Sequence, residues 1–194
     1  MNGTCAISNK GELVGDRRFS AVIGVLFFIM ATALGAYVRI PVHGSPVPIT
    51  LQTFFVILSA AVLGKRLGLF SQLGYLVLGM AGLPLFQGVA CGFSYLFTVT
   101  GGYLIGFILA AYFIGRSLAT DNPGILRIAV TFAVGSLIIL ASGAIWLVCL
   151  FKIDAMKAIS MGILPFIPGD VVKIFFAVII YSNISKRAKA IFGS

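Results

Sequence analysis

The stretch Leu164-Pro165-Phe166-Ile167-Pro168-Gly169-Asp170-Val171-Val172-Lys173 opens the last apolar segment of the chain and places two opposite charges in it. Asp170 and Lys173 are three residues apart, and side chains at that spacing share one face of an α-helix. Ionisable groups within a bilayer are costly, so they usually face a partner or a cavity. The pair therefore predicts a polar site within an apolar, helical protein. A second interpretation is that Asp170 caps the helix and pairs with Lys173.

The composition of the chain indicates a membrane protein. Of 194 residues, 60% are hydrophobic and 10% are charged, and the mean hydropathy is +1.11. Soluble domains have about 45–50% apolar and about 25% charged residues. A hydrocarbon core of about 30 Å needs roughly 20 residues per helix, and the chain has apolar material for about six such helices. We therefore expect an all-α integral membrane protein with little room for a soluble domain.

The apolar segments predict six transmembrane helices with the N- and C-termini in the cytoplasm. Residues 1–18 would form a cytoplasmic N-terminal tail, residues 19–185 the six-helix membrane domain, and residues 186–194 a basic cytoplasmic C-terminal tail. Turn-forming and basic residues separate the helices. The predicted helices span residues 19–38, 49–63, 69–80, 103–118, 125–150 and 170–184.

The net charge of +9 is explained by topology rather than by a nucleic-acid partner. The basic residues form short clusters between apolar runs, as the positive-inside rule describes. With the N-terminus inside, most of them fall on the cytoplasmic side, which faces membrane lipid headgroups and the cell interior. The cytoplasmic set is Lys10, Arg17, Arg18, Lys65, Arg66, Arg116, Arg127, Lys186, Arg187 and Lys189, and the outer set is Arg39, Lys152 and Lys157.

Two irregular segments are expected on the outer face, where residue 170 also lies. The proline-rich segment 39–48 predicts a rigid loop, and its His43 is the only histidine of the chain. The glycine-rich segment 81–102, between the third and fourth helices, carries no charge. Irregular backbone is not tolerated against lipid, so this outer loop is expected to lie against protein, and a lid is the favoured interpretation.

Small residues in the first helix allow another helix to approach closely. Ala31 and Gly35 are four residues apart, as in small-x-x-x-small motifs. The motif can serve packing within this chain or docking on a separate subunit, and the sequence leaves both open.

The motifs of common enzymes are absent from the sequence. No phosphate-binding G-x-x-x-x-G-K-[ST] stretch, no H-E-x-x-H and no G-x-S-x-G occurs, and one histidine with five acids gives no catalytic cluster. We expect neither an enzyme nor a metal site nor a cofactor. The outer-face polar set suits binding of a small, mostly apolar molecule with a few hydrogen-bonding groups; it consists of Thr50, Gln52, Gln87, Tyr95, Asp170 and Lys173.

Four stretches together resemble the BioY family, the biotin-binding S components of energy-coupling factor transporters. They are Pro46-Val47-Pro48-Ile49-Thr50-Leu51-Gln52-Thr53, Gly82-Leu83-Pro84-Leu85-Phe86, Thr100-Gly101-Gly102-Tyr103-Leu104-Ile105-Gly106-Phe107 and Phe166-Ile167-Pro168-Gly169-Asp170-Val171-Val172-Lys173. The resemblance covers roughly residues 20–185.

The resemblance implies a six-helix fold in the plasma membrane of a prokaryote, with biotin held near the outer face. It implies that Asp170 and Lys173 contact the ureido ring and that Gln87 supplies a side-chain amide. It also implies a transmembrane coupling subunit, met by Ala31 and Gly35, and a pair of cytoplasmic ATPases. Aromatic side chains that could cover the ring are Phe86, Phe93 and Tyr95.

The sequence therefore predicts a multi-pass subunit that captures biotin for uptake driven by a separate ATPase module. The rival hypothesis is a self-sufficient transporter or facilitator of biotin or a related vitamin. A purely structural membrane protein is disfavoured by the concentration of polar residues on one face.

Overall fold

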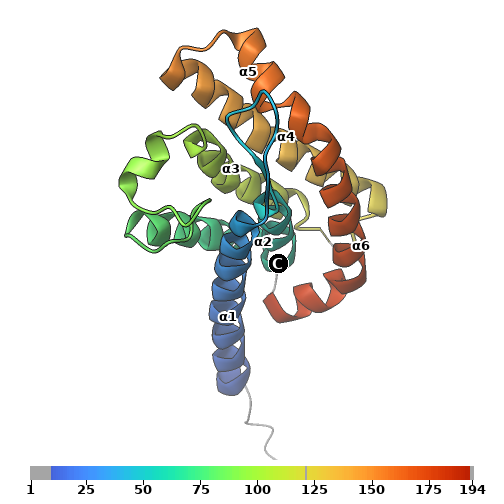
Figure 1. Ribbon diagram of the computed structural model, residues 1–194. Helices are drawn as coiled ribbons and strands as arrows, with labels where there is room; N and C mark the ends of the chain where they lie inside the picture. Colours follow the sequence, from blue (N-terminus) through green and yellow to red (C-terminus); the bar gives the residue numbers. More distant parts are fainter. Residues whose placement is uncertain (1–9, 121, 193–194) are drawn as a thin grey trace, which may run out of the picture.

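The computed structural model describes residues 10–120 and 122–192, which are helical apart from loops and one short hairpin (Figure 1). The all-α class predicted from the sequence is confirmed. The helices are α1 (Lys10–Tyr37), α2 (Gln52–Met80), α3 (Gly101–Ser117), α4 (Ile125–Phe151), α5 (Ala155–Gly162) and α6 (Ile167–Phe192), with 3-10 turns η1 (Phe93–Phe97) and η2 (Leu164–Phe166).

Four stretches of the described chain are long and apolar enough to cross a membrane. They are Arg17–Tyr37, Gln52–Met80, Ile125–Phe151 and Ala155–Phe192, and the helix Gly101–Ser117 is apolar but shorter. Together they make the chain a multi-pass membrane protein by length and composition.

Helix α2 consists of two arms joined at Gly64, where the sequence predicts a break between two helices. Gly64 has φ 75° and ψ −176°, a backbone conformation that glycine adopts readily and other residues avoid. The second arm folds back on the first: Gln72 Nε2 donates to Ser59 Oγ at 2.9 Å, and Gln52 Nε2 donates to Tyr75 Oη at 2.7 Å. A Cβ on Gly68 would lie 2.7 Å from the Cα of Ala60, so the turn depends on glycine for close approach.

The start of α1 differs from the predicted start of the first helix. The helix begins at Lys10 rather than at residue 19, because the polar residues before the apolar run are compatible with helix and no proline interrupts them. The placement of residues 1–18 in the cytoplasm stays a prediction, and residues 1–9 lie outside the described part.

The proline-rich segment after α1 is a small β-hairpin rather than a plain loop. Strands β1 (Arg39–Ile40) and β2 (Ile49–Thr50) pair antiparallel, with Arg39 opposite Thr50 and Ile40 opposite Ile49. The predicted helix at residue 49 therefore starts later, at Gln52. Pro48 removes a helical donor and the β-branched Ile49 and Thr50 suit a strand, which explains the difference.

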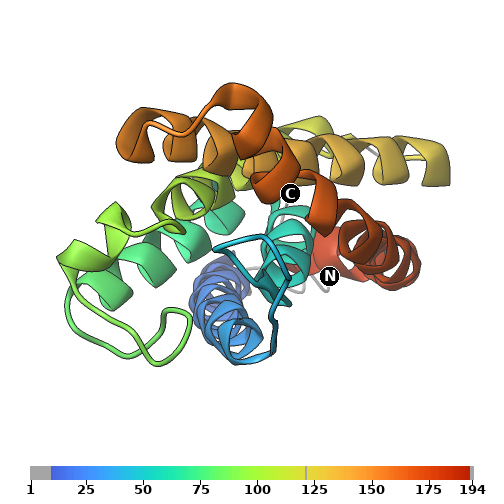
Figure 2. The same ribbon diagram turned by 45° about the horizontal axis from the view of Figure 1, so that its top comes forward.

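The helices pack around α2, which contacts α1, α3 and α6, while α4 contacts α3, α5 and α6. Figure 2 shows α1 (blue) nearly end-on, with α4 (yellow to light orange) running across the top of the view. Helices α3 and α4 approach closely through glycine: a Cβ on Gly106 would lie 2.9 Å from the Cα of Ile139, and one on Gly102 would lie 2.1 Å from the Cβ of Trp146. Small residues at helix contacts are the usual means of such packing in membranes.

The segment before α6 is more regular than the predicted loop. Asp154 caps the short helix α5 by accepting from the backbone N–H of Met156 at 3.0 Å, as aspartate does at helix N-termini. Helix α6 begins at Ile167, three residues earlier than predicted, because proline is tolerated in a first turn, where its missing N–H has no helical partner. Asp170 is thereby placed in the first turn of α6, three residues after its beginning, and Lys173 lies in the next turn.

Candidate functional site

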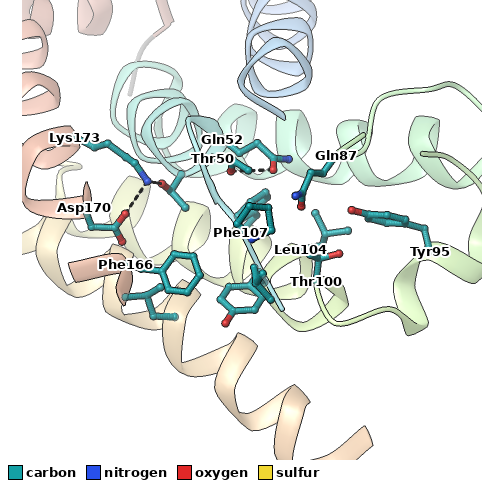
Figure 3. Close-up of a pocket in the computed structure, with 15 residues that line it drawn as sticks. Thr50, Gln52, Gln87, Tyr95, Thr100, Leu104, Phe107, Phe166, Asp170 and Lys173 are labelled. Carbon is teal, nitrogen blue, oxygen red and sulfur yellow. Dashed lines mark hydrogen bonds and ion pairs between the residues drawn. The ribbon is translucent and has the colours of Figure 1, made fainter. Parts of the chain in front are cut away.

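One pocket is enclosed by segments that are far apart in the sequence. The hairpin, the start of α2, the glycine-rich loop, α3, α4 and the beginning of α6 all contribute to its wall (Figure 3). The lining residues are Val47, Pro48, Thr50, Gln52, Thr53, Gln87, Tyr95, Thr100, Tyr103, Leu104, Phe107, Leu140, Phe166, Asp170 and Lys173.

The two ends of the pocket are lined by different polar side chains. In Figure 3, Asp170 and Lys173 lie on one side and Tyr95 and Gln87 on the other. Apolar side chains such as Leu104 and Phe107 lie between them. This arrangement suits an elongated ligand with polar groups at its ends and an apolar middle.

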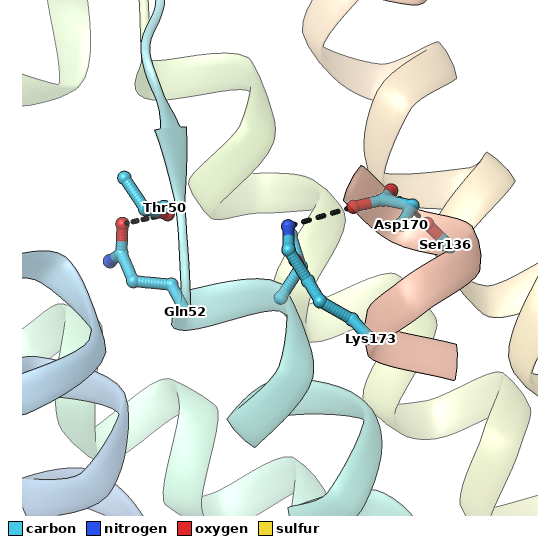
Figure 4. Close-up of polar contacts among 6 residues, drawn as sticks. Thr50, Gln52, Ser136, Asp170 and Lys173 are labelled. Atoms are coloured by element: carbon cyan, nitrogen blue, oxygen red, sulfur yellow. Dashed lines mark hydrogen bonds and ion pairs between the residues drawn. The ribbon is translucent and has the colours of Figure 1, made fainter. Parts of the chain in front are cut away.

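The ion pair predicted between residues 170 and 173 is present and buried. Lys173 Nζ lies 2.8 Å from Asp170 Oδ1, and the two residues are 9% and 5% exposed. Two further side chains complete the pair: Lys173 Nζ donates to Thr53 Oγ1 at 2.8 Å, and Ser136 Oγ donates to Asp170 Oδ2 (Figure 4). A buried ion pair is tolerable only with such additional hydrogen bonds.

The interpretation of Asp170 as a helix cap is wrong. Asp170 lies in the first turn of α6, after the helix has begun at Ile167, and its two oxygens accept from Lys173 and Ser136. Each carboxylate oxygen has two lone pairs and an ammonium has three N–H groups. Asp170 therefore keeps acceptor capacity, and Lys173 keeps one N–H beyond those given to Thr53 and Asp170.

A second polar chain runs beside the pocket and reaches the glycine-rich loop. Thr50 Oγ1 donates to Gln52 Oε1 at 3.1 Å, Gln52 Nε2 donates to Tyr75 Oη at 2.7 Å, and Tyr75 Oη donates to the carbonyl oxygen of Leu85 at 3.0 Å. Hydrogen bonds in a chain polarise one another inside a protein. This series of hydrogen bonds fixes the positions of Thr50 and Gln52 relative to the glycine-rich loop.

Two aromatic side chains of the glycine-rich loop stack on each other and stabilise it. Phe86 is fully buried and stacks on Tyr95 with ring centroids 4.7 Å apart. Phe86 is absent from the pocket wall in this conformation, where its neighbour Tyr95 lies instead, so a contact of Phe86 with a ligand stays a prediction. Phe93 is 63% exposed and also lies outside the wall. The loop contains enough apolar surface to bury a side chain of its own.

The pocket is narrow in this conformation. Its cavity volume is about 40 Å³, whereas pockets for drug-sized ligands have roughly 300–1,000 Å³. A ligand of that size therefore requires part of the wall to move. The loop between α2 and α3, residues 81–100, is the longest wall segment that is not α-helical, so a lid stays its favoured interpretation.

Six of the seven predicted ligand-contacting residues come together in the pocket wall. They are Thr50, Gln52, Gln87, Tyr95, Asp170 and Lys173. Ser136 and Thr53 were not predicted as site residues, although each binds one member of the ion pair. It also missed the face of α3 that contains Thr100, Tyr103, Leu104 and Phe107, whose i, i+3, i+4, i+7 spacing is a signal for one helix face.

The two small residues of α1 face the interior of this chain. Ala31 is 6% exposed, and a Cβ on Gly35 would lie 2.9 Å from the backbone nitrogen of Gln52. The structure therefore favours packing within the chain, the first of the two alternatives. A contact of Ala31 or Gly35 with a coupling subunit stays a prediction.

Within residues 10–120 and 122–192, no group of three or more metal-ligating side chains occurs. The polar atoms of the pocket are those of a carboxylate, an ammonium, amides and hydroxyls. Their chemistry is that of hydrogen bonding and ion pairing.

Apolar helices around one polar, partly enclosed pocket define a membrane protein that binds a small solute. The BioY family model matches residues 10–190. The chain is 40% identical over 156 residues to the probable biotin transporter BioY of Pyrococcus horikoshii, covering 80% of this chain and 90% of that protein. It is 40% identical over 159 residues to the biotin transporter BioY of Thermotoga maritima, covering 82% and 92%.

A solved structure shares the fold. It is the crystal structure of the S-component for biotin from an ECF-type ABC transporter, with a TM-score of 0.79 and 26% identity, covering 92% of this chain and 95% of that chain. The chain belongs to the BioY family. Membership in this family of transporter proteins confirms the expectation that the chain is not an enzyme.

Proposed function

We propose that the chain captures biotin in the pocket between α2, α3, α4 and α6 and presents it for uptake across the membrane. The observation that carries the proposal is the buried Asp170–Lys173 pair on the pocket wall, in a chain that is similar to proteins named for biotin transport.

The hydrogen-bond donors and acceptors that the pair leaves unused match those of a ureido group. A ureido ring offers two N–H donors and one carbonyl acceptor. Asp170 has lone pairs left to accept from the N–H groups, and Lys173 has one N–H left to donate to the carbonyl oxygen. Hydrogen bonds to charged groups are about twice as strong as neutral ones. Gln87, Thr50 and Gln52 supply neutral hydrogen-bonding groups farther along the wall.

The apolar side of the pocket matches the rest of such a ligand. Leu104, Phe107, Leu140 and Phe166 line the wall and would cover the sulfur-containing ring and the aliphatic tail, while Tyr95 lies at the loop end. Each buried CH₂ group contributes about 0.8 kcal/mol. Apolar burial would supply affinity, and the ion pair would supply selectivity.

The topology proposed is six membrane crossings with both termini in the cytoplasm of a prokaryote. It counts the two arms of α2 separately, because Gly64 turns the second arm back on the first. Lys65 and Arg66 then lie at the cytoplasmic turn, as the positive-inside rule favours. The hairpin, the glycine-rich loop and α5 would share the outer face.

Transport would be driven by partners, because the sequence has no nucleotide-binding motif. The solved structure that shares this fold is the S-component for biotin from an ECF-type ABC transporter. We infer that this chain likewise works with a transmembrane coupling subunit and a pair of cytoplasmic ATPases.

Equilibrium binding of biotin to the purified chain tests the first half of the proposal. Submicromolar binding is expected, and Asp170→Asn should weaken it by roughly 100-fold. Absence of binding by folded wild-type protein would refute the assignment of biotin. Uptake by cells with and without a coupling module tests the second half: uptake that persists without the module would favour a self-sufficient transporter.

A further inference from the structure

The outer rim of the pocket contains a cation, Arg39, which lines the adjoining hollow and not the pocket wall itself. Arg39 belongs to strand β1 and is paired in register with Thr50 of β2. Thr50 lines the pocket. The hairpin therefore places the backbone of Arg39 directly beside a residue of the pocket wall.

The side chain of Arg39 reaches the glycine-rich loop. A Cβ on Gly88 would lie 3.0 Å from Arg39 Nη1, so the guanidinium lies against the loop backbone next to Gln87, another residue of the wall. Gly88 has φ 76°, and the lack of a side chain there leaves room for the guanidinium. Arg39 thus bridges the two segments that border the outer end of the pocket.

The charge of Arg39 acts on that end of the pocket. Burial raises the pKa of the Tyr95 phenol, and the positive charge of Arg39 acts in the opposite direction. Tyr95 lies at the end away from Asp170 and Lys173 (Figure 3). The guanidinium is therefore within electrostatic reach of the outer end, whereas the ion pair at the inner end is neutral overall.

A hollow beside the pocket gives access to Arg39. It has a volume of about 490 Å³ and is lined by Arg39, Pro41, Val42, Ser45, Pro46 and Pro48. Pro48 also lines the pocket, so the hollow and the pocket adjoin. No acid lies in the wall of either space except Asp170.

Arg39 is exposed, and the salt bridge found among the side chains that the structure describes is that of Asp170 with Lys173. The acids Glu12 and Asp16 lie near the beginning of α1, whereas Arg39 follows its end. At 1.5 Å per residue they are about 35 Å away along the helix. The rim therefore presents a guanidinium that can take an anion, which guanidinium groups bind in a bidentate manner.

We propose that Arg39 binds the carboxylate of the ligand at the mouth of the pocket and thereby selects the free acid over neutral derivatives. This inference rests on the proposed function, in which the uncharged ureido end of biotin reaches Asp170 and Lys173. The carboxylate at the other end of the molecule then lies at the Tyr95–Gln87 end, beside Arg39. A single charge at the rim gives the pocket a preferred ligand orientation.

The test compares biotin with biotin methyl ester, which differs by the loss of the negative charge. Binding of both is measured to the wild-type chain, to Arg39→Gln, and to Lys152→Gln as a matched control. Lys152 is also an exposed cation of the predicted outer set and lies at the end of α4, outside both hollows. The two substitutions change the net charge equally.

Arg39→Gln is expected to weaken the binding of biotin roughly tenfold, which corresponds to the loss of one charged hydrogen bond. The affinity for the ester should stay unchanged. Lys152→Gln should leave both unchanged. Added salt should weaken biotin binding to the wild-type chain and have less effect on Arg39→Gln. Arg39→Lys should restore part of the affinity for the acid, because it keeps the charge but loses the planar fork.

Equal weakening of acid and ester in Arg39→Gln would overturn the inference and would make Arg39 a support for the loop. Unchanged binding of both ligands would overturn it as well, as would a wild-type chain that binds acid and ester equally. Unchanged binding of the ester also shows that the variant is folded. If the wild-type chain binds neither ligand, the proposed function itself fails and the inference fails with it.

Discussion

The two ends of the pocket are built in opposite ways. At the inner end, Asp170 and Lys173 come from one helix and are each held by a side chain from another, Ser136 of α4 and Thr53 of α2. At the outer end, Gln87 and Tyr95 come from the loop between α2 and α3, which is attached to the helices by hydrogen bonds from Tyr37, Tyr75 and Trp146 to its carbonyl oxygens. We expect the ureido end of the ligand to be recognised by side chains that are fixed on helices, and access to the pocket to depend on movement of the loop.

The largest effect is expected from breaking the inner end. Asp170→Asn and Lys173→Met should each weaken biotin binding by roughly 100-fold, because each removes charged hydrogen bonds to the ligand. Each single variant also leaves one buried charge without its partner, which costs about 3–5 kcal/mol of stability. Binding and thermal unfolding are measured together.

The double variant Asp170→Asn/Lys173→Met separates the two effects. With no unpaired charge left, its unfolding temperature should return toward that of the wild type, while binding stays lost. A double variant that binds biotin normally would show that the pair has only a structural role.

A smaller effect is expected from the support of the carboxylate. Ser136→Ala should weaken binding by roughly tenfold, because Asp170 loses the donor that fixes its position. Ser160→Ala is the matched control, since Ser160 is exposed and bonds only to the backbone of Lys157. Equal affinity of the two variants would mean that α6 alone positions Asp170.

The hydrogen bonds that join Gln52 of the pocket wall to the loop through Tyr75 predict a change in loop motion rather than in affinity. Tyr75→Phe removes the hydroxyl that joins Gln52 to Leu85 and should lower the free energy of unfolding by about 1–2 kcal/mol. Hydrogen exchange of residues 81–100 should speed up, and biotin should bind and leave faster. Tyr112→Phe, on an exposed residue of α3, is the control, and equal exchange rates in both variants would contradict the link.

The smallest effect is expected at the far end of the loop. Trp146 Nε1 donates to the carbonyl oxygen of Thr98 at 3.1 Å, so Trp146→Phe should cost about 1 kcal/mol locally. Faster exchange confined to residues 93–98 is the expected result. A global loss of stability would show instead that the ring is needed where Gly102 packs against it.

Local patterns in the sequence predicted the inner end well, and contacts between distant residues were missed. Asp170 and Lys173 could be paired because three residues of helix separate them. Ser136 and Thr53 could not be joined to them, since they lie on other helices and a single serine or threonine is common in membrane helices. The break at Gly64 was predicted from glycine and basic residues, but the hairpin depends on pairing between Arg39 and Thr50. The burial of Phe86 could not be predicted, because an aromatic residue in a loop can face the ligand or the core, and only packing decides.

The return at Gly64 also determines how deep the pocket lies. The first arm of α2, residues 52–63, rises about 18 Å at 1.5 Å per residue, whereas the hydrocarbon core of a bilayer is about 30 Å thick. The arm is largely buried among its neighbours, so lipid need not thin to match it. If Gly64 lies at the cytoplasmic surface, Gln52 and Thr53 lie about 12 Å beneath the opposite surface. Because the first arm is shorter than the bilayer, the pocket at its end then lies below the membrane surface. Water is scarce at that depth, so each hydrogen bond to the solute contributes more to binding.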